Sequence, residues 1–240
     1  RVAPLVKGAV PEDGSVPDCR PVAVGGCARR LYTSATMRNH KEDFRKALWP
    51  HQAAVGVKDG QQHVTLAVAT TLRQQKEFVV VKVDIANAFN TCTRASMLAA
   101  VARHRVLRRL LPLYAATLVP SSRLMMRGPN GELEDIDSRS EEGGHQGCAS
   151  TGAAFCLALH PSIVAASEAL EAEGGYARFF ADDGYLVGPH DAVLEALVEF
   201  ERQVARECGL TLNRSKTEWH AASAATGDRV RKDMEGAGLK

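Results

Sequence analysis

Two adjacent carboxylates, Asp182 and Asp183, lie between two apolar runs in the segment 176–188. The apolar runs around Asp183-Gly184 predict a strand, a tight turn and a second strand. Two like charges at a buried turn repel each other and resist desolvation, so a cation that neutralises them makes the pair easier to accommodate. Hard carboxylate oxygens on a rigid hairpin suit Mg²⁺. Taken alone, the segment is equally consistent with an ordinary polar hairpin turn.

A third carboxylate fits the same site. The apolar run 78–85 ends near Asp84 and is too continuous for a half-exposed strand, so it predicts a buried central one. An Asp at the end of such a strand, beside an Asp-Asp hairpin, would gather two or three carboxylates around two metal ions. Two ions about 3.5–4 Å apart support in-line phosphoryl transfer. We therefore expect two Mg²⁺ ions, with Mn²⁺ as the substitute.

The bulk composition sets wide limits. The 240 residues are 45% hydrophobic with a mean hydropathy of −0.17, which favours one large globular domain or two small lobes. A net charge of +2 means that nucleic-acid binding must come from local patches. We see no apolar run near the roughly 20 residues that cross a bilayer, and expect no membrane partner. The six cysteines include no Cys-x-x-Cys pair, which argues against a zinc knuckle or a disulfide framework.

The elements that must position the carboxylates follow from pattern. Residues 1–33 suggest irregular or edge-strand structure. Apolar periodicity and turn residues predict the other elements, which are helices at 34–49, 61–75, 93–111, 150–170 and 191–208, strands at 78–85 and 210–219, and hairpins at 122–136 and 176–188. The helix 61–75 should pack Leu66, Val68 and Leu72. This order fits an α+β fold with a split βαβ, ferredoxin-like sheet and helices on one face.

Four segments resemble, in order, the palm motifs of reverse transcriptases. Asp84, followed five residues later by the aromatic Phe89, resembles the first motif. Gln146-Gly147 before a helix resembles the second, and the Phe-Ala-Asp-Asp box at 180–183 resembles the third. The segment 210–217, which ends in Lys-Thr, resembles the fourth motif. Each box alone is weak, but four in the right order are specific.

The resemblance extends over about residues 18–219. Upstream, the segments 18–22 and 52–60 resemble finger motifs of non-LTR retrotransposon enzymes. The sequences around 87–90 and 145–148 are most similar to the site-specific elements of trypanosomatids. The resemblance implies a polymerase palm at 78–219, with fingers elements interleaved near 112–142.

The same resemblance assigns the two ends of the chain. It implies a fingers-like region at 1–77 and a tail or truncated start of a thumb at 220–240. The thumb that clamps template and primer is therefore expected to be largely absent. Because the chain starts at Arg1 without an apolar secretory segment, we expect a piece of a longer polyprotein with other domains.

By this resemblance, Asp84 and Asp182 are the principal metal ligands and Asp183 is a weaker one. The Ile85 carbonyl would complete one coordination shell. Lys216 would approach the pyrophosphate and act as a general acid, since a point charge suits a phosphate leaving group. A plain surface lysine at a strand end is the alternative for Lys216.

The resemblance also implies a nucleotide subsite. The ring of Phe89 would lie under the incoming sugar and exclude a 2′-hydroxyl, although a core Phe is the simpler interpretation. Gln146 and Gly147 would touch the nucleotide, unless they form only a flexible loop. Arg20 would contact the triphosphate from the fingers, by a looser match.

A basic run lies in the helix expected at 93–111. It consists of Arg103, Arg105, Arg108 and Arg109. Such a face can grip a phosphate backbone, and it can equally be a solvated surface.

The resemblance therefore implies an RNA-directed DNA polymerase that extends a DNA 3′ end with dNTPs. Its partners would be template RNA, primer or target DNA and dNTPs, in the nucleus. An inactive palm that serves as an RNA-binding scaffold, or a decayed retroelement remnant, is the alternative. The retained carboxylates argue against it. An RNA-templated RNA polymerase is a third option, against which Phe89 argues.

Overall fold

The structure is a computed structural model that describes residues 2–6, 19–23, 26–127, 130–145 and 147–240. In 2–6 and 19–23 only the backbone is described.

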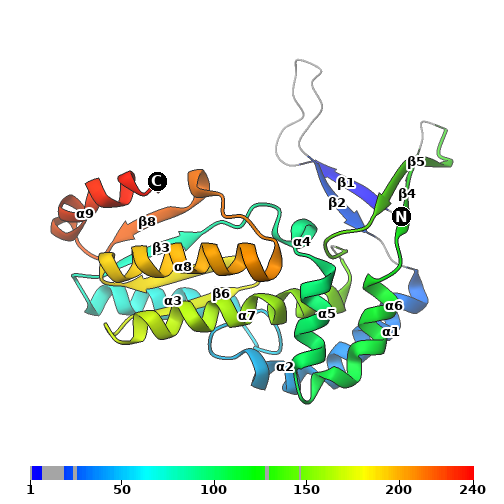
Figure 1. Ribbon diagram of the computed structural model, residues 1–240, viewed down its shortest axis with the longest axis horizontal. Coiled ribbons are helices and arrows are strands. Elements are labelled where there is room, and N and C mark those ends of the chain that lie inside the picture. The colour runs from blue at the N-terminus through cyan, green and yellow to red at the C-terminus, as the bar shows by residue number, and fades with distance from the viewer. Residues whose placement is uncertain (1, 7–18, 24–25, 128–129, 146) are drawn as a thin grey trace.

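A four-stranded sheet forms the centre of the fold (Figure 1). Its strand order is β6 (Tyr176–Phe180), β7 (Asp183–Gly188), β3 (Val79–Val83) and β8 (Glu218–Ala221), and every neighbouring pair is antiparallel. The predicted central strand is confirmed, because β3 lies between β7 and β8 and four of its five residues are buried. Its valines have side chains on both faces of the sheet, which explains the unbroken apolar run.

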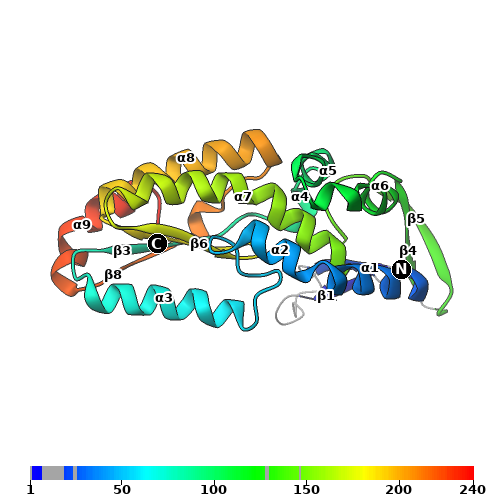
Figure 2. The same cartoon turned by 90° about the horizontal axis from the view of Figure 1, so that it is seen from below.

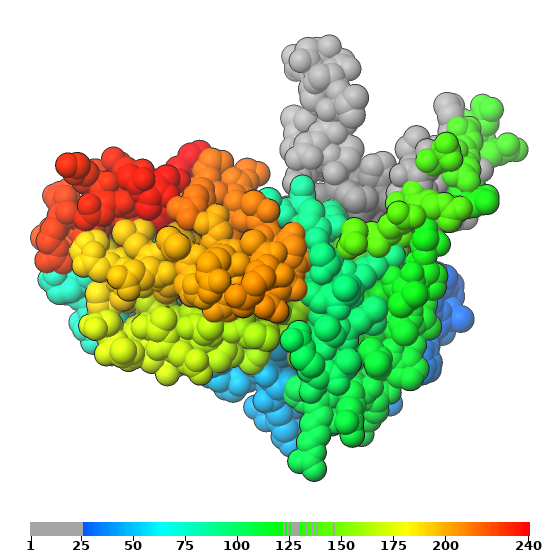
Figure 3. Space-filling model, viewed as in Figure 1, coloured from blue at the N-terminus to red at the C-terminus, as the bar shows by residue number. Residues whose placement is uncertain are grey.

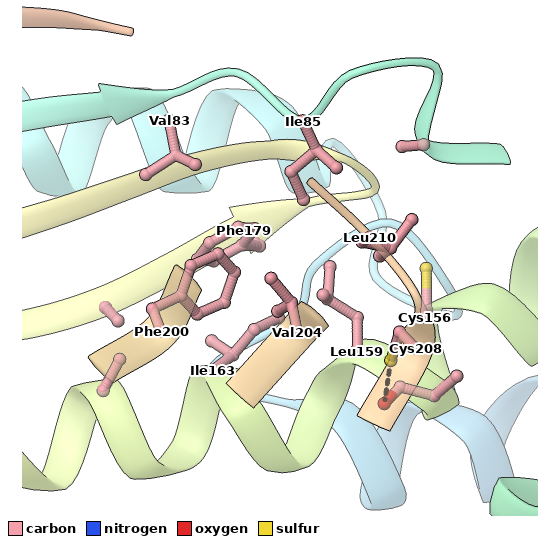
Figure 4. Packing of buried hydrophobic residues seen from close by; sticks show 14 of the residues in the cluster. Val83, Ile85, Cys156, Leu159, Ile163, Phe179, Phe200, Val204, Cys208 and Leu210 are labelled. Atoms are coloured by element: carbon pink, nitrogen blue, oxygen red, sulfur yellow. Dashed lines mark hydrogen bonds between the residues drawn. The ribbon is translucent and has the colours of Figure 1, made fainter. Parts of the chain in front are cut away.

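Helices α7 (Ala149–Glu171) and α8 (His190–Cys208) cover one face of this sheet (Figure 2). Figure 4 shows Ile163 of α7 and Phe200 and Val204 of α8 packed against Phe179 of β6. The rings of Phe179 and Phe200 are 5.2 Å apart between centroids. The chain order β3, α7, β6, β7, α8, β8 confirms the predicted split βαβ, ferredoxin-like arrangement.

Helix α3 (Gly60–Gln74) lies on the opposite face of the sheet (Figure 2). A small second cluster joins the helix to that face: Val68, Phe78, Val80 and Val187. The helix was predicted, but its place on a second face was not, because helices were expected on one face. One of its three expected packing residues was also wrong. Leu66 is 64% exposed, and Val64, at 2%, is buried instead.

Short helices and two antiparallel strand pairs form the other end of the molecule in the described part of the chain (Figure 1). The elements are β1 (Val2–Val6), β2 (Cys19–Ala23), α1 (Cys27–Asn39), α2 (Lys41–Leu48), α4 (Ala88–Thr91), α5 (Arg94–Arg103), a 3-10 helix (Leu107–Leu110), α6 (Leu111–Leu118), β4 (Ser122–Arg127) and β5 (Leu133–Ser140). The hairpin expected at 122–136 is confirmed as β4–β5, and β1 pairs with β2.

Two helix predictions in this part were wrong in extent. The helix expected at 34–49 is two helices that meet at His40, and the first begins at Cys27, inside the region expected to be irregular. The helix expected at 93–111 ends at Arg103. The His104 ring nitrogen Nδ1 accepts the Leu107 N–H at 3.2 Å, and this local bond competes with continued helix.

Helix α9 (Ala224–Gly236) follows β8 in the region expected to be a tail or the start of a thumb. The Ser223 hydroxyl caps it by accepting the Thr226 N–H. Val230 and Met234 are fully buried in the main core. Figure 3 shows the red segment of α9 lying against the orange segment that contains β8. The helix is thus integrated with the sheet.

Helix α7 corrects one expectation about hydropathy. Its 23 residues are long and apolar enough to span a membrane by length and composition, whereas we saw no such run in the sequence. In this fold 67% of the most apolar window is buried inside the protein. Packing in the core therefore accounts for its composition.

Candidate active site

Asp84 follows β3 directly, and its backbone is fixed by the segment before β8. The Asn213 N–H donates to the Asp84 carbonyl at 2.8 Å, and the Asp84 N–H donates to the Thr217 hydroxyl at 3.3 Å. Thr217 is fully buried and also donates to the Asn213 carbonyl. These bonds on both sides of Asp84 hold its Cα–Cβ direction.

Asp182 lies in the turn between β6 and β7. Phe180 pairs with Asp183, so the two-residue turn is Ala181-Asp182, not the predicted Asp183-Gly184. Gly184 lies inside β7, and packing explains its identity. A Cβ there would come within 2.1 Å of the Phe179 ring.

A cavity of about 640 Å³ gathers the predicted motifs. Its lining includes six predicted site residues: Asp84, Ile85, Phe89, Gly147, Asp182 and Lys216. They come from four segments separated along the chain. Other polar residues of the lining were not predicted: Asn87, Asn90, His145 and Asn213.

Three of the predicted catalytic and nucleotide-binding residues are not placed in this cavity. Asp183 is exposed at the start of β7 and does not line it. Asp182 is a turn residue, whereas Asp183 is the first residue of the strand. Gln146 lies outside the described residues. The side chain of Arg20 does too, although its backbone belongs to β2.

The chemistry of the lining fits a divalent cation. Two carboxylates face one polar cavity, and no side-chain partner of the Asp84 carboxylate is found in the described part of the chain. Ile85 is 5% exposed and its side chain packs in the core (Figure 4), so its backbone is what it offers to the cavity. The described ranges contain no cluster of three His, Cys, Asp or Glu side chains arranged for a metal. Two carboxylates are therefore the negatively charged donors that this lining offers to a cation.

The charge of Asp182 also affects the pKa of Cys156 in α7. Burial, and secondarily the Asp182 carboxylate, raise the pKa of the Cys156 thiol well above its usual range. This thiol is therefore neutral, and it contributes no charge beside the cavity.

Phe89 forms one wall of the cavity. Its ring stacks on Phe155 with centroids 4.5 Å apart. Its carbonyl accepts the Gly144 N–H at 2.6 Å. Gly143 has φ of +67°, and a Cβ there would lie 2.1 Å from the Asn90 carbonyl oxygen. Only glycine permits this approach, which joins the first and second motifs.

Arg94 donates hydrogen bonds to the same glycine turn. Its role was not predicted. It is 6% exposed and donates to the Gly143 carbonyl at 3.0 Å, the Leu118 carbonyl at 3.0 Å and the Ser140 hydroxyl at 2.7 Å. Burial lowers the pKa of its guanidinium. Its carbonyl partners compensate for much of the burial of the charge.

His145 follows this turn and lines the cavity in its neutral form. Burial, then the charges of Arg29 and Arg94, lower the pKa of His145. Its Nδ1 lies 3.4 Å from the Arg29 guanidinium, which can only donate.

The predicted basic face is not one helical surface. Arg103 ends α5, Arg105 lies in the turn, and Arg108 and Arg109 lie in the 3-10 helix. All four are exposed. Arg109 is paired with Asp43 at 2.6 Å, and Arg103 donates to the Ala99 carbonyl. The remaining charges, Arg105 and Arg108, lie on a shallow hollow that includes Arg109.

Comparisons with known proteins agree with this geometry. Residues 11–230 match the family model described as reverse transcriptase (RNA-dependent DNA polymerase). No curated protein matches the chain.

Solved telomerase structures have a similar fold. Apo telomerase from Candida tropicalis aligns with TM-score 0.60 and 11% identity over 81% of this chain and 37% of that chain. A form truncated from its C-terminal domain aligns with TM-score 0.59 and 13% identity over 92% and 49%. Telomerase from Candida albicans in complex with a TWJ fragment of telomeric RNA gives 0.53 and 12% over 83% and 35%. The chain spans less than half the length of these proteins, and identities this low show the fold alone.

Proposed function

Because this chain belongs to the reverse transcriptase (RNA-dependent DNA polymerase) family, we propose that it extends a DNA 3′ end with dNTPs on an RNA template as the polymerase region of a non-LTR retrotransposon. One observation supports this most directly. A single cavity brings together Asp84, Asp182, Phe89 and Lys216, which come from three of the four motif segments, and Gly147 from the remaining one.

Asp84 and Asp182 would hold two Mg²⁺ ions, with the Ile85 carbonyl beside them and Asp183 in an outer role. Such ions, when bound, lower the pKa of a primer 3′-hydroxyl and neutralise the charge of the pyrophosphate. The hydrogen bonds at Asp84 and the tight turn at Asp182 fix the backbone of the two residues beside one cavity. This preorganisation lowers the cost of bringing the ligands together.

The remaining lining residues would bind and select the nucleotide. Lys216 provides a cation at the cavity for the triphosphate and, as a general acid, a proton for the leaving pyrophosphate. The Phe89 ring, supported by Phe155, would exclude a 2′-hydroxyl. Gly147 has φ of +94° and lets the backbone come close to the nucleotide.

The nucleic-acid partners in this proposal are template RNA and a DNA primer or target. A telomerase of similar fold is described in complex with an RNA fragment, which supports an RNA partner. Exposed Arg105 and Arg108 would contact backbone phosphates. A retroelement enzyme of this kind would act in the nucleus together with other domains of its polyprotein.

Primer extension on an RNA template with dNTPs and Mg²⁺ tests the proposal. The chain should extend the primer, Asp182→Asn should abolish extension, and Asp228→Asn, which changes an exposed carboxylate of α9, should not. Activity that appears only in a chain extended beyond Lys240 would keep the assignment and show that a further region is required. A lack of extension by both chains would favour the inactive RNA-binding scaffold.

A further inference from the structure

A buried loop residue contacts the turn that carries Asp182. Gln52 follows α2 and has no exposed surface. Its segment lies beside β6, the edge strand of the sheet, since the Phe179 N–H donates to the His51 carbonyl and the Ala53 N–H donates to the Phe179 carbonyl, both at 2.8 Å. The loop therefore covers the strand edge next to the turn.

The Gln52 amide bonds both backbone groups of Ala181. Its Oε1 accepts the Ala181 N–H at 2.8 Å, and its Nε2 donates to the Ala181 carbonyl at 2.9 Å. Oε1 also accepts the Ala54 N–H at 3.1 Å. The opposite amide orientation would place NH₂ against two N–H donors, so the network fixes the orientation.

Ala181 needs such support because its backbone is strained. Its φ is +57°, in the left-handed region that residues with a Cβ rarely occupy. Strained conformations persist where the surroundings determine them, and they gather at functional sites. The next residue in the chain is Asp182, at the cavity.

We propose that Gln52 is a positioning residue, which holds the Ala181 peptide in its left-handed conformation and thereby sets the direction of the Asp182 carboxylate. The inference rests on the proposed function, because it gives Gln52 a role in the same polymerase site. Gln52 acts through Asp182 and itself does not line the cavity.

Gln52→Glu is the sharpest test, because it preserves size and keeps an acceptor for the two N–H groups. In the ionised Glu, an oxygen replaces the Nε2 that donates to the Ala181 carbonyl, and the two oxygens repel each other. When protonated, it supplies an O–H donor in place of the amide. Burial raises the pKa of a carboxyl group, so the protonated form of the introduced Glu should become dominant as the pH falls. The exposed Gln62→Glu on α3 is the matched control.

We expect the extension rate of Gln52→Glu to be at least tenfold below that of the unsubstituted chain at pH 8.5, with KM for dNTP little changed. The ratio of the two rates should rise at least fivefold by pH 6. The nearby ionisable side chains of Asp182, Asp183, His51 and His160 are present in both proteins, so their effects on the two rates cancel in the ratio. A ratio that stays constant with pH, or equals one at pH 8.5, would overturn the proposal.

A second readout does not need polymerase activity. Mn²⁺ titrated calorimetrically, at a temperature well below the melting temperature of each protein, should bind Gln52→Met at least fivefold more weakly than the unsubstituted chain or Gln62→Glu. Equal Mn²⁺ affinity in the three proteins would contradict the role of Gln52. If no protein extends a primer yet the affinities differ as expected, the proposed function fails and the positioning role stands.

Discussion

At the residue scale, the cavity depends on buried side chains that fix the backbone as well as on those that line it. Thr217 bonds the peptide of Asp84, Gln52 bonds the peptide before Asp182, and Arg94 bonds the turn at Gly143. Removal of any of the three side chains leaves backbone groups without hydrogen-bond partners. We expect the first effect to be a change in the backbone conformation beside the cavity.

Phe89 is predicted to set the choice of sugar. Phe89→Val shortens the wall of the cavity and makes room for a 2′-hydroxyl, so kcat/KM for NTP relative to dNTP should rise by about 10–200-fold. Steady-state incorporation of matched dNTP and NTP pairs measures this ratio.

Phe78→Val is the matched control, because Phe78 packs on the other face of the sheet. An unchanged ratio in Phe89→Val would show that the ring serves only the core. High NTP incorporation by the unsubstituted chain would instead favour the RNA polymerase alternative.

The sequence predicted the lining residues better than their supports. Asp84, Phe89 and Lys216 belong to short local patterns that can be recognised without the fold. Gln52 and Arg94 form hydrogen bonds with residues that are 129 and 49 positions away in the sequence. A local sequence pattern does not predict such contacts. Asp183 stays a prediction as a weaker ligand, because it is exposed at the start of β7 and does not line the cavity.

At the element scale, long periodic segments were predicted well and the ends of short ones were not. The sequence ranges of α3 and α8 follow from apolar periodicity, and those of α7 and β3 follow from long apolar runs. The helix that ends at Arg103 does so because of the His104 side-chain bond, which a periodicity window does not detect.

His160 of α7 connects two elements and predicts a pH dependence. Its Nε2 bonds the Leu48 carbonyl at the end of α2 at 3.2 Å. Burial, then the charge of His51, lower its pKa from 6.5 to about 4. The folded protein therefore binds fewer protons than the unfolded one, so this stabilisation is complete above pH 6.5 and is lost as the pH falls toward 4.

The loss in the free energy of unfolding should be about 3 kcal/mol from this group. Urea unfolding between pH 4 and pH 7 measures it. His160→Gln should flatten that dependence, whereas His220→Gln, at an exposed position of β8, is the control. Parallel pH curves for His160→Gln and the unsubstituted chain would contradict the assignment.

At the scale of the whole molecule, α9 is part of the same core as the sheet. Met234 is fully buried, so Met234→Ala should lower the free energy of unfolding by about 2–5 kcal/mol. Urea unfolding measures the change, and exposed Lys232→Ala is the control. Equal stability of the two variants would mean that α9 is only loosely attached.

The architecture itself was largely predictable because it follows from the order of the elements. A βαββαβ order with right-handed connections leaves few sheet topologies. The position of α3 was not predictable, since an amphipathic helix does not encode which face of a sheet it covers.

The unequal cores on the two faces of the sheet have a consequence for thermal fluctuations. On one side α7 and α8 share the large cluster, while on the other side a much smaller cluster joins α3 to the sheet. Local opening is least costly where the least apolar surface must be exposed. We therefore expect α3 to detach transiently long before the rest unfolds, leaving the strands that carry the two carboxylates seated on α7 and α8.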